Sequence, residues 1–306
     1  MFMFSLPKNV TLIEVGPRDG LQNEKNNIPT EVKLSFIQAL HDAGIKEMEL
    51  TSFVSPKWVP QMKDAQEIVQ RVRKNGRQLV LTPNKKGIHA AINAGAESLA
   101  VFVGVSDTFN QKNIHCSTSE SVTALRPLIQ QVKQDGHYVR ACISTAFHCP
   151  YEGFIRPEQT VALCRQFVEM GVDELSVADT DGMANPLASH SLFSNLKTQF
   201  PEVLITAHFH DTRKMGIANI YASLQAGVNR FDTSAGGLGG CPFSPGATGN
   251  VATEDVLYLL QSLHIETGID LTGICLAVDE VAPYLSRPIE TAMYQLYKRE
   301  QLERKE

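Results

Sequence analysis

The chain has 306 residues, of which 43% are hydrophobic, and its formal net charge at pH 7 is −5. This length and composition allow a large buried core, built as one big α/β domain or as two smaller ones. The mild charge and the lack of a dense Lys/Arg block exclude a nucleic-acid-binding surface, and no apolar run approaches the roughly 18 residues of a membrane span. We therefore expect neither nucleic acid nor a membrane as a partner.

The cysteines and the first residues indicate the compartment. The six cysteines form no CxxC pair and are too few for a secreted disulfide scaffold, which favours reduced thiols. The opening segment MFMFSLPKNV has no basic region before its apolar residues and is too short for a signal peptide. Both observations predict a cytoplasmic protein.

Eight short runs rich in β-branched residues alternate with longer segments along the chain. In the longer segments, such as residues 31–44 and 157–171, apolar residues recur at three- and four-residue spacing, which is typical of amphipathic helices. A glycine closes many of these helices, as expected for a residue in the left-handed region at a helix end. The predicted strands are residues 10–15, 47–53, 77–82, 99–105, 138–145, 174–179, 204–210 and 229–235, and the closing glycines are Gly44, Gly76, Gly95, Gly136, Gly171 and Gly227.

This alternation predicts an α/β fold, a (β/α)₈ TIM barrel formed by a single domain over residues 1–306. A doubly wound sheet would carry a Gly-rich phosphate-binding turn after its first strand. The segment EVGPRDGLQ has neither the GxGxxG nor the GxxxxGK[ST] spacing of such turns. Residues from about 265 to 306 are expected to add a helical extension that packs on the barrel.

Polar residues gather at the predicted C-terminal ends of the strands, where barrel enzymes place their chemistry. Each taken singly can be structural: a hydrogen-bonded histidine, a surface ion pair or a small buried thiol. Independent structural residues would be spread over both ends of the barrel, so their joint placement favours an active site. They are Arg18, Asp19 and Gln22 for the first strand, Glu49 and Ser52 for the second, Ser176, Asp179 and Asp181 for the sixth, and His208, His210 and Asp211 for the seventh.

The segment LITAHFHDTRKMG, residues 204–216, carries two histidines two positions apart. Side chains alternate along a strand, so His208 and His210 point one way and Phe209 points the other. With Asp19 they offer one carboxylate oxygen and two imidazole nitrogens, a set suited to Mg²⁺ or Mn²⁺, while Zn²⁺ and Co²⁺ are not excluded. A divalent ion beside Arg18 would stabilise developing oxyanion charge on a hydroxy-acyl substrate.

The eighth strand runs into GGLGGCPFSPGATGN, residues 236–250, which is longer than an ordinary βα connection. Its glycines permit backbone conformations closed to other residues, which predicts a mobile lid. Cys241 lies between Gly240 and Pro242, where lid closure would bring its thiol onto bound substrate. Asn250 can offer an amide oxygen to a metal. The alternative is a plain connection without chemistry.

Five segments together resemble the signatures of the 3-hydroxy-3-methylglutaryl-CoA (HMG-CoA) lyase family. The resemblance extends from Thr11 to Leu260, and its first and last segments are specific. The family belongs to a wider group of metal-dependent TIM-barrel carbon–carbon lyases and Claisen synthases, which share an R-D-G turn and an H-x-H strand. The segments are EVGPRDGLQNE, TSFVSPKWVPQM, CPYEG, HFHDT and GGLGGCPFSPGATGNVATED.

The resemblance implies retro-Claisen cleavage of HMG-CoA to acetyl-CoA and acetoacetate. It implies an acyl-CoA thioester as partner, with CoA as part of the substrate, and a homo-oligomer, either a dimer or a tetramer. Arg18 would stabilise the thioester enolate. The implied metal ligands are Asp19, His208, His210 and Asn250; the implied catalytic residues are Arg18, Glu49, Asp179, His208 and Cys241; and the implied substrate-binding residues are Arg18, Gln22, Ser52 and Ser176.

Two segments depart from the family's pattern. Where the family reads G-D-T-I-G after strand six, this chain has ADTDG, which places Asp181 where an apolar residue is expected. After the histidines it has DTRKMG in place of a small-residue D-T-x-G-x-A pattern. A carboxylate of Asp181 that pointed into the pocket would repel an anionic substrate. A lyase for a methylmalyl- or citramalyl-type CoA thioester is therefore an alternative.

Two further functions are open. A Claisen synthase of the isopropylmalate type normally carries a long regulatory extension, whereas only residues 265–306 follow the eighth helix here. A non-catalytic CoA-binding scaffold would have no need of Arg18 and of every expected metal ligand. The lyase is the leading hypothesis.

Overall fold

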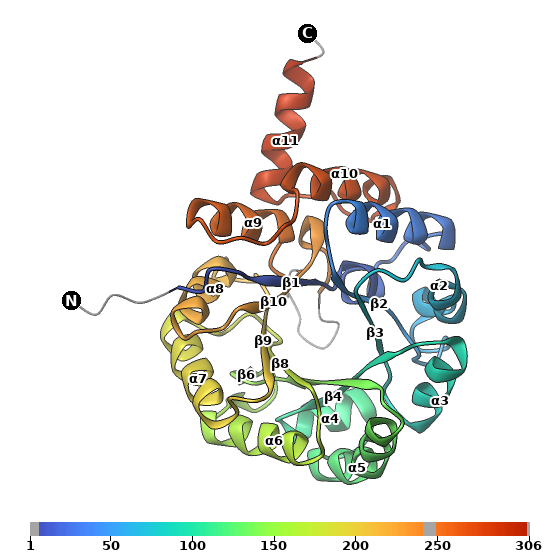
Figure 1. Ribbon diagram of the computed structural model, residues 1–306, viewed down its shortest axis with the longest axis vertical. Coiled ribbons are helices and arrows are strands. Elements are labelled where there is room, and N and C mark those ends of the chain that lie inside the picture. The colour runs from blue at the N-terminus through green and yellow to red at the C-terminus, as the bar shows by residue number, and fades with distance from the viewer. Residues whose placement is uncertain (1–5, 241–248, 305–306) are drawn as a thin grey trace, which may run out of the picture.

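The computed structural model describes residues 6–240 and 249–304, and its centre is a closed barrel of eight parallel strands (Figure 1). Each strand pairs with its neighbours in chain order, and β1 pairs with both β2 and β10 to close the barrel. The predicted barrel is therefore confirmed. Its strands are β1 (Thr11–Glu14), β2 (Glu47–Ser52), β3 (Arg77–Leu81), β4 (Ser98–Gly104), β5 (Tyr138–Ser144), β8 (Glu174–Asp179), β9 (Leu204–Phe209) and β10 (Arg230–Thr233).

Helices surround the barrel in the alternating order that the apolar spacing predicts (Figure 1). Every glycine predicted to close a helix has a positive φ, between 70° at Gly76 and 104° at Gly44. The helices of the ring are α1 (Thr30–Asp42), α2 (Ala65–Arg71), α3 (Lys85–Ala94), α4 (Asp107–Ile114), α5 (Thr118–Gln134), α6 (Pro157–Glu169), α7 (Pro186–Gln199), α8 (Gly216–Gln225) and α9 (Thr253–Ser262).

Two helices follow the ring at the C-terminal end of the described chain. Helix α10 (Leu271–Val281) packs against α1, and α11 (Ala292–Glu303) extends beyond the barrel (Figure 1). The expected helices after residue 265 are therefore present. Within the described residues, no helix is long and apolar enough to cross a membrane.

Two local elements were not foreseen. The segment Gly16–Gly20, expected to be a turn, forms one turn of π-helix that carries Arg18 and Asp19. After β5, the antiparallel pair β6 (His148–Cys149) and β7 (Gly153–Phe154) makes a small hairpin over the end of the barrel. Both elements lie after strands, on the face where the polar residues gather.

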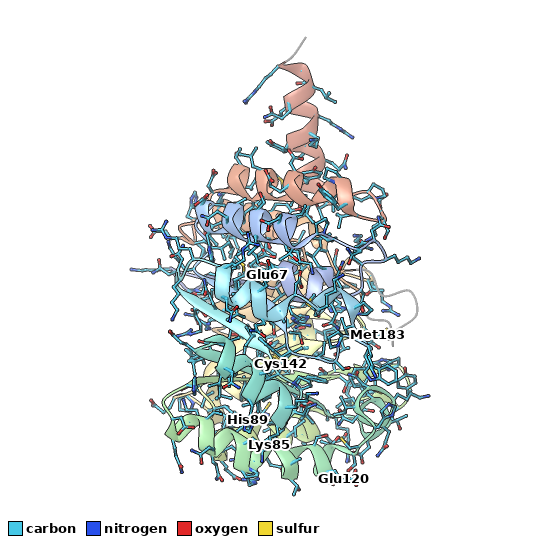
Figure 2. The ribbon with its side chains drawn as sticks, turned by 90° about the vertical axis from the view of Figure 1, so that its right-hand side faces the viewer. Glu67, Lys85, His89, Glu120, Cys142 and Met183 are labelled. Atoms are coloured by element: carbon cyan, nitrogen blue, oxygen red, sulfur yellow. The ribbon has the colours of Figure 1, made fainter. Side chains whose placement is uncertain are left out.

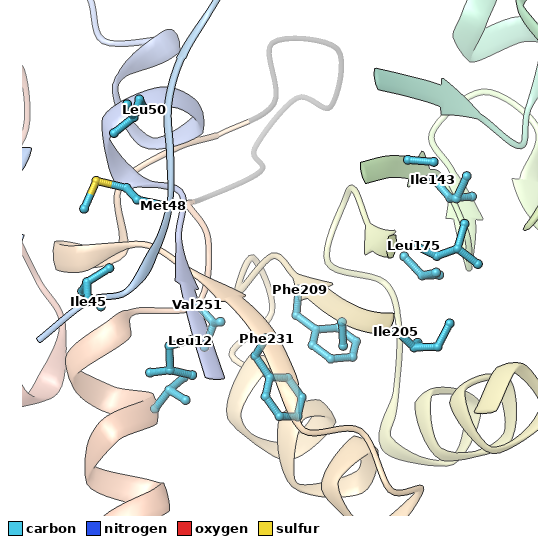
Figure 3. Close-up of a cluster of buried hydrophobic side chains, with 14 of the residues drawn as sticks. Leu12, Ile45, Met48, Leu50, Ile143, Leu175, Ile205, Phe209, Phe231 and Val251 are labelled. Atoms are coloured by element: carbon cyan, nitrogen blue, oxygen red, sulfur yellow. The ribbon is translucent and has the colours of Figure 1, made fainter. Parts of the chain in front are cut away.

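The two faces of the strands bury different kinds of side chain. Phe209 and Phe231 belong to the large apolar cluster between the barrel and its helices (Figure 3). The opposite face of the same strands points into the barrel, where Asp232 pairs with Arg140. At the other end of the barrel Arg230 pairs with Glu47 at 2.5 Å and with Glu174 at 3.4 Å. The inner face of these strands therefore buries paired charges, whereas the outer face buries apolar side chains.

Candidate active site

The two histidines of β9 lie side by side at the C-terminal end of the barrel. The ring centroids of His208 and His210 are 5.3 Å apart, and both residues are buried. Phe209 between them points into the outer apolar cluster (Figure 3). The predicted alternation is confirmed, because a strand places every second side chain on one face.

Asp19 completes a group that could hold a metal ion. One oxygen of Asp19 and one ring nitrogen each of His208 and His210 lie within 4.8 Å of one another. Nδ1 of His210 is buried and has no hydrogen-bond partner in the described part of the chain. A carboxylate and two imidazoles are common ligands of divalent ions, and a buried nitrogen without a partner is explained by an ion. The residues therefore fit a divalent metal.

Asn250 joins this group from the far end of the glycine-rich segment. Its Nδ2 donates to Oδ2 of Asp19 at 2.7 Å and to the backbone oxygen of Leu238 at 3.1 Å. A backbone bridge to His210 holds Asn250 beside β9. Because Nδ2 is used in these bonds, Oδ1 is the amide atom left for an ion, and it too is buried without a partner among residues 6–240 and 249–304. This geometry suits the fourth expected ligand.

The ionisation of two of these side chains, Asp19 and His210, favours cation binding. Burial acts to raise the pKa of Asp19, but Arg18 and the two histidines outweigh it and lower this pKa to about 2. Burial, together with the neighbouring His208, lowers the pKa of His210 to about 4. At neutral pH, Asp19 is an anion and His210 is a neutral imidazole, which are the states that bind metals.

Arg18 lies beside the group and is held by a second carboxylate. Its Nε and Nη2 donate to Oε2 of Glu49 at 2.9 and 2.6 Å, and its Nη1 donates to Oδ1 of Asp19 at 2.6 Å. Burial acts to lower the pKa of Arg18, but the charges of Glu49 and Asp19 raise it above its ordinary value. The guanidinium is therefore a fixed, permanent cation next to the candidate metal site.

Asp179 is a buried carboxyl group at the end of β8. It accepts backbone hydrogen bonds from Met183 at 2.9 Å and from Ala184 at 3.1 Å. Burial raises the pKa of Asp179 to about 7 despite these bonds. A carboxyl group that titrates near neutral pH can both give and take a proton, which suits the proton-handling role expected for Asp179.

The expected substrate-binding residues take different places. Ser176 is buried and donates to Oδ2 of Asp232 at 2.8 Å. Ser52 is fully buried, and its hydroxyl donates to the backbone oxygen of Leu81 at 3.3 Å. Oε1 of Gln22 is buried and has no partner within the described ranges. Of the three, only Gln22 presents an unused polar atom.

Cys241 lies outside the described residues, but the start of its segment is well fixed. Oε1 of Glu14 accepts the backbone N–H groups of Gly16 at 2.8 Å and of Ala235 at 2.9 Å. Oε2 of Glu254 accepts the N–H group of Gly236 at 3.1 Å. Glu14 thereby ties the turn that carries Arg18 to the start of the glycine-rich segment.

Cys142 is a second thiol near the site. It lies on β5 and is half-buried (labelled in Figure 2). Burial raises the pKa of Cys142 to about 12. This thiol is therefore uncharged at neutral pH and a poor nucleophile.

The sequence interpretation missed Asp232 and Arg140. Asp232 lies on β10, directly opposite His208 on β9, and its Oδ2 lies 3.0 Å from Nδ1 of that histidine. The same oxygen accepts a short hydrogen bond from Arg140 of β5. The sequence did contain an indication of this pair. Arg140 and Asp232 lie in the middle of the strand segments YVRACIST and NRFDTSA, and a charged residue that is buried needs a partner.

The two departures from the family's pattern meet in space. Oδ2 of Asp181 lies 2.6 Å from Nδ1 of His148, on the hairpin after β5. Nη1 of Arg213, from the DTRKMG segment, donates to the backbone oxygens of Asp181 at 2.9 Å and of Gly182 at 3.2 Å. Three loops are thereby joined at the mouth of the barrel, and the carboxylate of Asp181 has a partner.

A family model and curated proteins match this chain over most of its length. The model of the HMGL-like family matches residues 9–281. The cytoplasmic 3-hydroxy-3-methylglutaryl-CoA lyase of Danio rerio is 43% identical over 292 residues, which cover 95% of this chain and 87% of that protein. The 3-hydroxy-3-isohexenylglutaryl-CoA/hydroxymethylglutaryl-CoA lyase of Pseudomonas aeruginosa is 42% identical over 285 residues, with 92% and 95% covered.

Solved structures agree with these relatives. The hydroxymethylglutaryl-CoA lyase of Pseudomonas aeruginosa has a TM-score of 0.93 at 41% identity, over 97% of this chain and all of that chain. An HMG-CoA lyase of Acinetobacter baumannii, in complex with coenzyme A and 3-methylmalate, has a TM-score of 0.90 at 32% identity, with 96% of both chains covered.

The barrel and the cluster at its C-terminal face define a TIM-barrel protein with an enzyme-like site. The chain belongs to the HMGL-like family, and the relatives and solved structures reported above carry the name of HMG-CoA lyases, which are carbon–carbon lyases. The resemblance noted from the sequence segments is therefore confirmed.

Proposed function

We propose that the protein cleaves 3-hydroxy-3-methylglutaryl-CoA to acetyl-CoA and acetoacetate. One observation carries this proposal: a fixed arginine and the group of Asp19, His208 and His210 lie together at the barrel face of an HMGL-like chain. Retro-Claisen cleavage needs a base for the 3-hydroxyl proton, a cation for the developing enolate oxygen and an acid for the enolate carbon. The site offers a group for each task.

Asp19, His208, His210 and Asn250 would hold a divalent ion, which supplies Lewis-acid polarisation and a template for the hydroxyl and carboxylate groups of the substrate. Arg18 would bind the thioester oxygen. Glu49 would keep the guanidinium in place, because two of its N–H groups donate to one oxygen of Glu49. A pre-oriented cation stabilises charge that develops during the reaction without having to reorganise.

Asp179 and Cys241 are the proposed proton-handling groups. A base takes the proton of the 3-hydroxyl group, the bond between C2 and C3 breaks, and its electron pair forms the enolate of acetyl-CoA. The departing fragment is acetoacetate, and a proton delivered to the enolate carbon completes acetyl-CoA. Asp179 suits the first step because its pKa of about 7 lies near physiological pH. Cys241 is proposed as the acid. Gln22, Ser52 and Ser176 are proposed as neighbours of the substrate.

The pairing of Asp181 bears on the choice of substrate. His148 engages one oxygen of Asp181, which reduces the repulsion that this carboxylate would exert on an anionic acyl group. The 3-hydroxy-3-methylglutaryl group is thus compatible with the site. The solved relative with bound 3-methylmalate keeps a methylmalyl- or citramalyl-type thioester as the second candidate.

The proposal also includes the metal ion, the cellular location and the assembly. Mg²⁺ or Mn²⁺ fits a site with oxygen and imidazole ligands and open positions, and Zn²⁺ or Co²⁺ is a possible replacement. A cytoplasmic location agrees with the cysteine pattern and with bacterial relatives of this family. A homo-oligomer, dimer or tetramer, is the proposed assembly.

The proposal is tested by incubating the purified protein and Mg²⁺ or Mn²⁺ with a panel of 3-hydroxyacyl-CoA thioesters and by measuring acetyl-CoA and its partner product. We expect HMG-CoA to give acetoacetate, and His210→Ala to lower kcat by orders of magnitude while the far-UV circular dichroism stays unchanged. Turnover of a methylmalyl-type thioester alone would replace the substrate. Condensation of acetyl-CoA with a 2-oxo acid would instead show a synthase, and no turnover with any thioester would leave a CoA-binding scaffold.

A further inference from the structure

The carboxylate of Asp232 accepts hydrogen bonds from three side chains on three other strands, one of which is a candidate metal ligand. We propose that Asp232 is a positioning residue that fixes the ring orientation and the tautomer of His208, and thereby sets the divalent-metal affinity of the group Asp19, His208 and His210. The inference rests on the proposed metal site, but it concerns a residue for which the sequence segments assign no role.

The strand register brings the two side chains together. Asp232 of β10 is the register partner of His208 of β9, so both side chains lie on the inner face of the barrel at the same height. Oδ2 of Asp232 lies 3.0 Å from Nδ1 of His208, and Asp232 is only 3% exposed. Strand residues in register are held by the backbone ladder, which makes this contact a rigid one.

The charge on Asp232 determines which ring nitrogen carries the proton. An ionised carboxylate only accepts hydrogen bonds, so Nδ1 of a neutral His208 must be the N–H donor. Nε2 then carries a lone pair, which is the form that binds a metal. Arg140 forms a short ion pair with Asp232 inside the barrel, and its permanent positive charge compensates the negative charge of an ionised carboxylate. Asp232 therefore stays ionised and keeps His208 in this tautomer.

Arg140 and Ser176 fix the carboxylate itself. Nη2 of Arg140 makes a short ion pair with Oδ2 of Asp232, and Oγ of Ser176 donates to the same oxygen at 2.8 Å. Arg140 is almost completely buried, so its charge compensates that of Asp232 inside the barrel. With donors from β5 and β8 on one side and His208 on the other, Oδ2 cannot turn away from the ring. Ser176 thus acts on His208 through Asp232.

The expected size of the effect follows from comparable metal sites. Removing a carboxylate that holds a metal-binding histidine typically weakens metal affinity by about 10- to 100-fold. The Asp232→Asn variant keeps the shape of the side chain but removes its charge. Its amide oxygen is a weaker acceptor, and its NH₂ group can donate to the ring and favour the other tautomer. We therefore expect a loss of Mn²⁺ affinity within that range.

The experiment measures Mn²⁺ binding without substrate, by electron paramagnetic resonance and calorimetry, for the wild type and for Asp232→Asn. A matched control is Glu47→Gln, which removes a half-buried carboxylate partner of Arg230 at the opposite end of the same barrel. Both variants should lower the melting temperature, because each removes one charged partner of a buried arginine. Only Asp232→Asn should weaken Mn²⁺ binding. Equal Mn²⁺ affinity in both variants would overturn the inference.

Two further measurements distinguish a lost positioning of the His208 ring from a general destabilisation of the fold. In a His208→Ala background, Asp232→Asn should cause no additional loss of Mn²⁺ affinity, because Asp232 acts through the ring. In the metal-free wild type, ¹⁵N NMR above the titration of His208 should show a proton on Nδ1. A proton on Nε2 of His208 would contradict the proposal. So would losses of Mn²⁺ affinity from His208→Ala and Asp232→Asn that add up in the double variant. If Asp232→Asn fails to fold, Arg140→Met/Asp232→Asn removes both charges of the pair and serves in its place.

The outcome is distinguishable from a failure of the proposed function. A wild type that binds no Mn²⁺ would remove the metal site, and with it both proposals. A wild type that binds Mn²⁺ and loses this affinity with Asp232→Asn, but cleaves no acyl-CoA, would retain the role of Asp232 and reject the lyase. Lyase activity together with an Mn²⁺ affinity that Asp232→Asn leaves unchanged would retain the lyase and reject the role of Asp232.

Discussion

Arg213 donates a hydrogen bond of 2.9 Å to the backbone oxygen of Asp181, and so links the two segments in which this chain departs from its family's pattern. His148 completes the contact from the hairpin after β5, with its Nδ1 at 2.6 Å from Oδ2 of Asp181. The two departing segments therefore belong to one arrangement at the mouth of the barrel. In it Arg213 holds the backbone at Asp181, and His148 is the partner of the Asp181 carboxylate.

This arrangement predicts a specific effect of His148→Ala. Removal of the imidazole leaves the Asp181 carboxylate without its partner, and its charge already acts on Asp179 within the site. An unpaired charge near an anionic acyl group costs on the order of 1 kcal/mol or more, so KM should rise about tenfold while kcat changes less. Steady-state kinetics with HMG-CoA provides the measurement.

The matched variant for this prediction is His148→Ala/Asp181→Asn. It removes the charge together with its partner, so KM should return toward the wild-type value. If KM stayed high in the double variant, the effect of His148 would be one of packing and not of charge.

Arg18→Gln should lower kcat by about 10²- to 10³-fold, the usual cost of losing a donor to a developing oxyanion. Mn²⁺ affinity should change much less, because Arg18 donates to Oδ1 of Asp19 and is not itself a ligand. Calorimetry with Mn²⁺ and single-turnover kinetics separate the two quantities. A collapse of metal affinity equal to the loss in kcat would show that Arg18 mainly organises Asp19.

Cys241 should react with alkylating agents faster than the cysteines of the barrel and its helices. Cys164 and Cys275 are buried, and burial raises the pKa of each thiol to about 12, which makes both poor nucleophiles. A thiol in an open glycine-rich segment is expected to be accessible, and a CoA ester with Mg²⁺ should protect it. Peptide mapping after brief alkylation tests this. Labelling confined to other cysteines, or no protection by ligand, would remove Cys241 from the active site.

Glu14→Gln should change how stability depends on pH. Burial raises the pKa of Glu14 from 4.5 to about 7, so between these values the folded protein holds a proton that the unfolded chain has released. The contribution of Glu14 to the free energy of unfolding is therefore present at low pH and is lost as pH rises through 7. Each unit of pKa shift corresponds to about 1.4 kcal/mol.

Urea unfolding at several pH values checks this sign. The free energy of unfolding of the wild type minus that of Glu14→Gln should decrease between about pH 5 and about pH 8. Glu300→Gln, at an exposed position on α11, is the control and should give a flat difference. A difference that rises with pH for Glu14→Gln would mean that Glu14 is ionised in the folded protein.

The sequence by itself determined the barrel and the location of the site. Apolar spacing along strands and helices is a local pattern, and eight alternating units leave the closed barrel as the fold that buries them all. Parallel strands bring their C-terminal ends to one face, so Arg18, Asp19, Glu49, His208 and His210 had to meet there. The closeness of the two histidines follows from strand alternation, whereas the π-helical turn after β1 brings Asp19 within 4.8 Å of them.

Only the tertiary structure decided which charged groups pair. Arg140 and Asp232 are 92 residues apart, and Asp181 is 33 residues from His148. The hairpin that presents His148 has no distinct periodicity in the sequence. A buried charge is stabilised by whichever opposite charge lies within hydrogen-bonding distance, and that distance is set by register and barrel closure, which a linear pattern of residues does not encode.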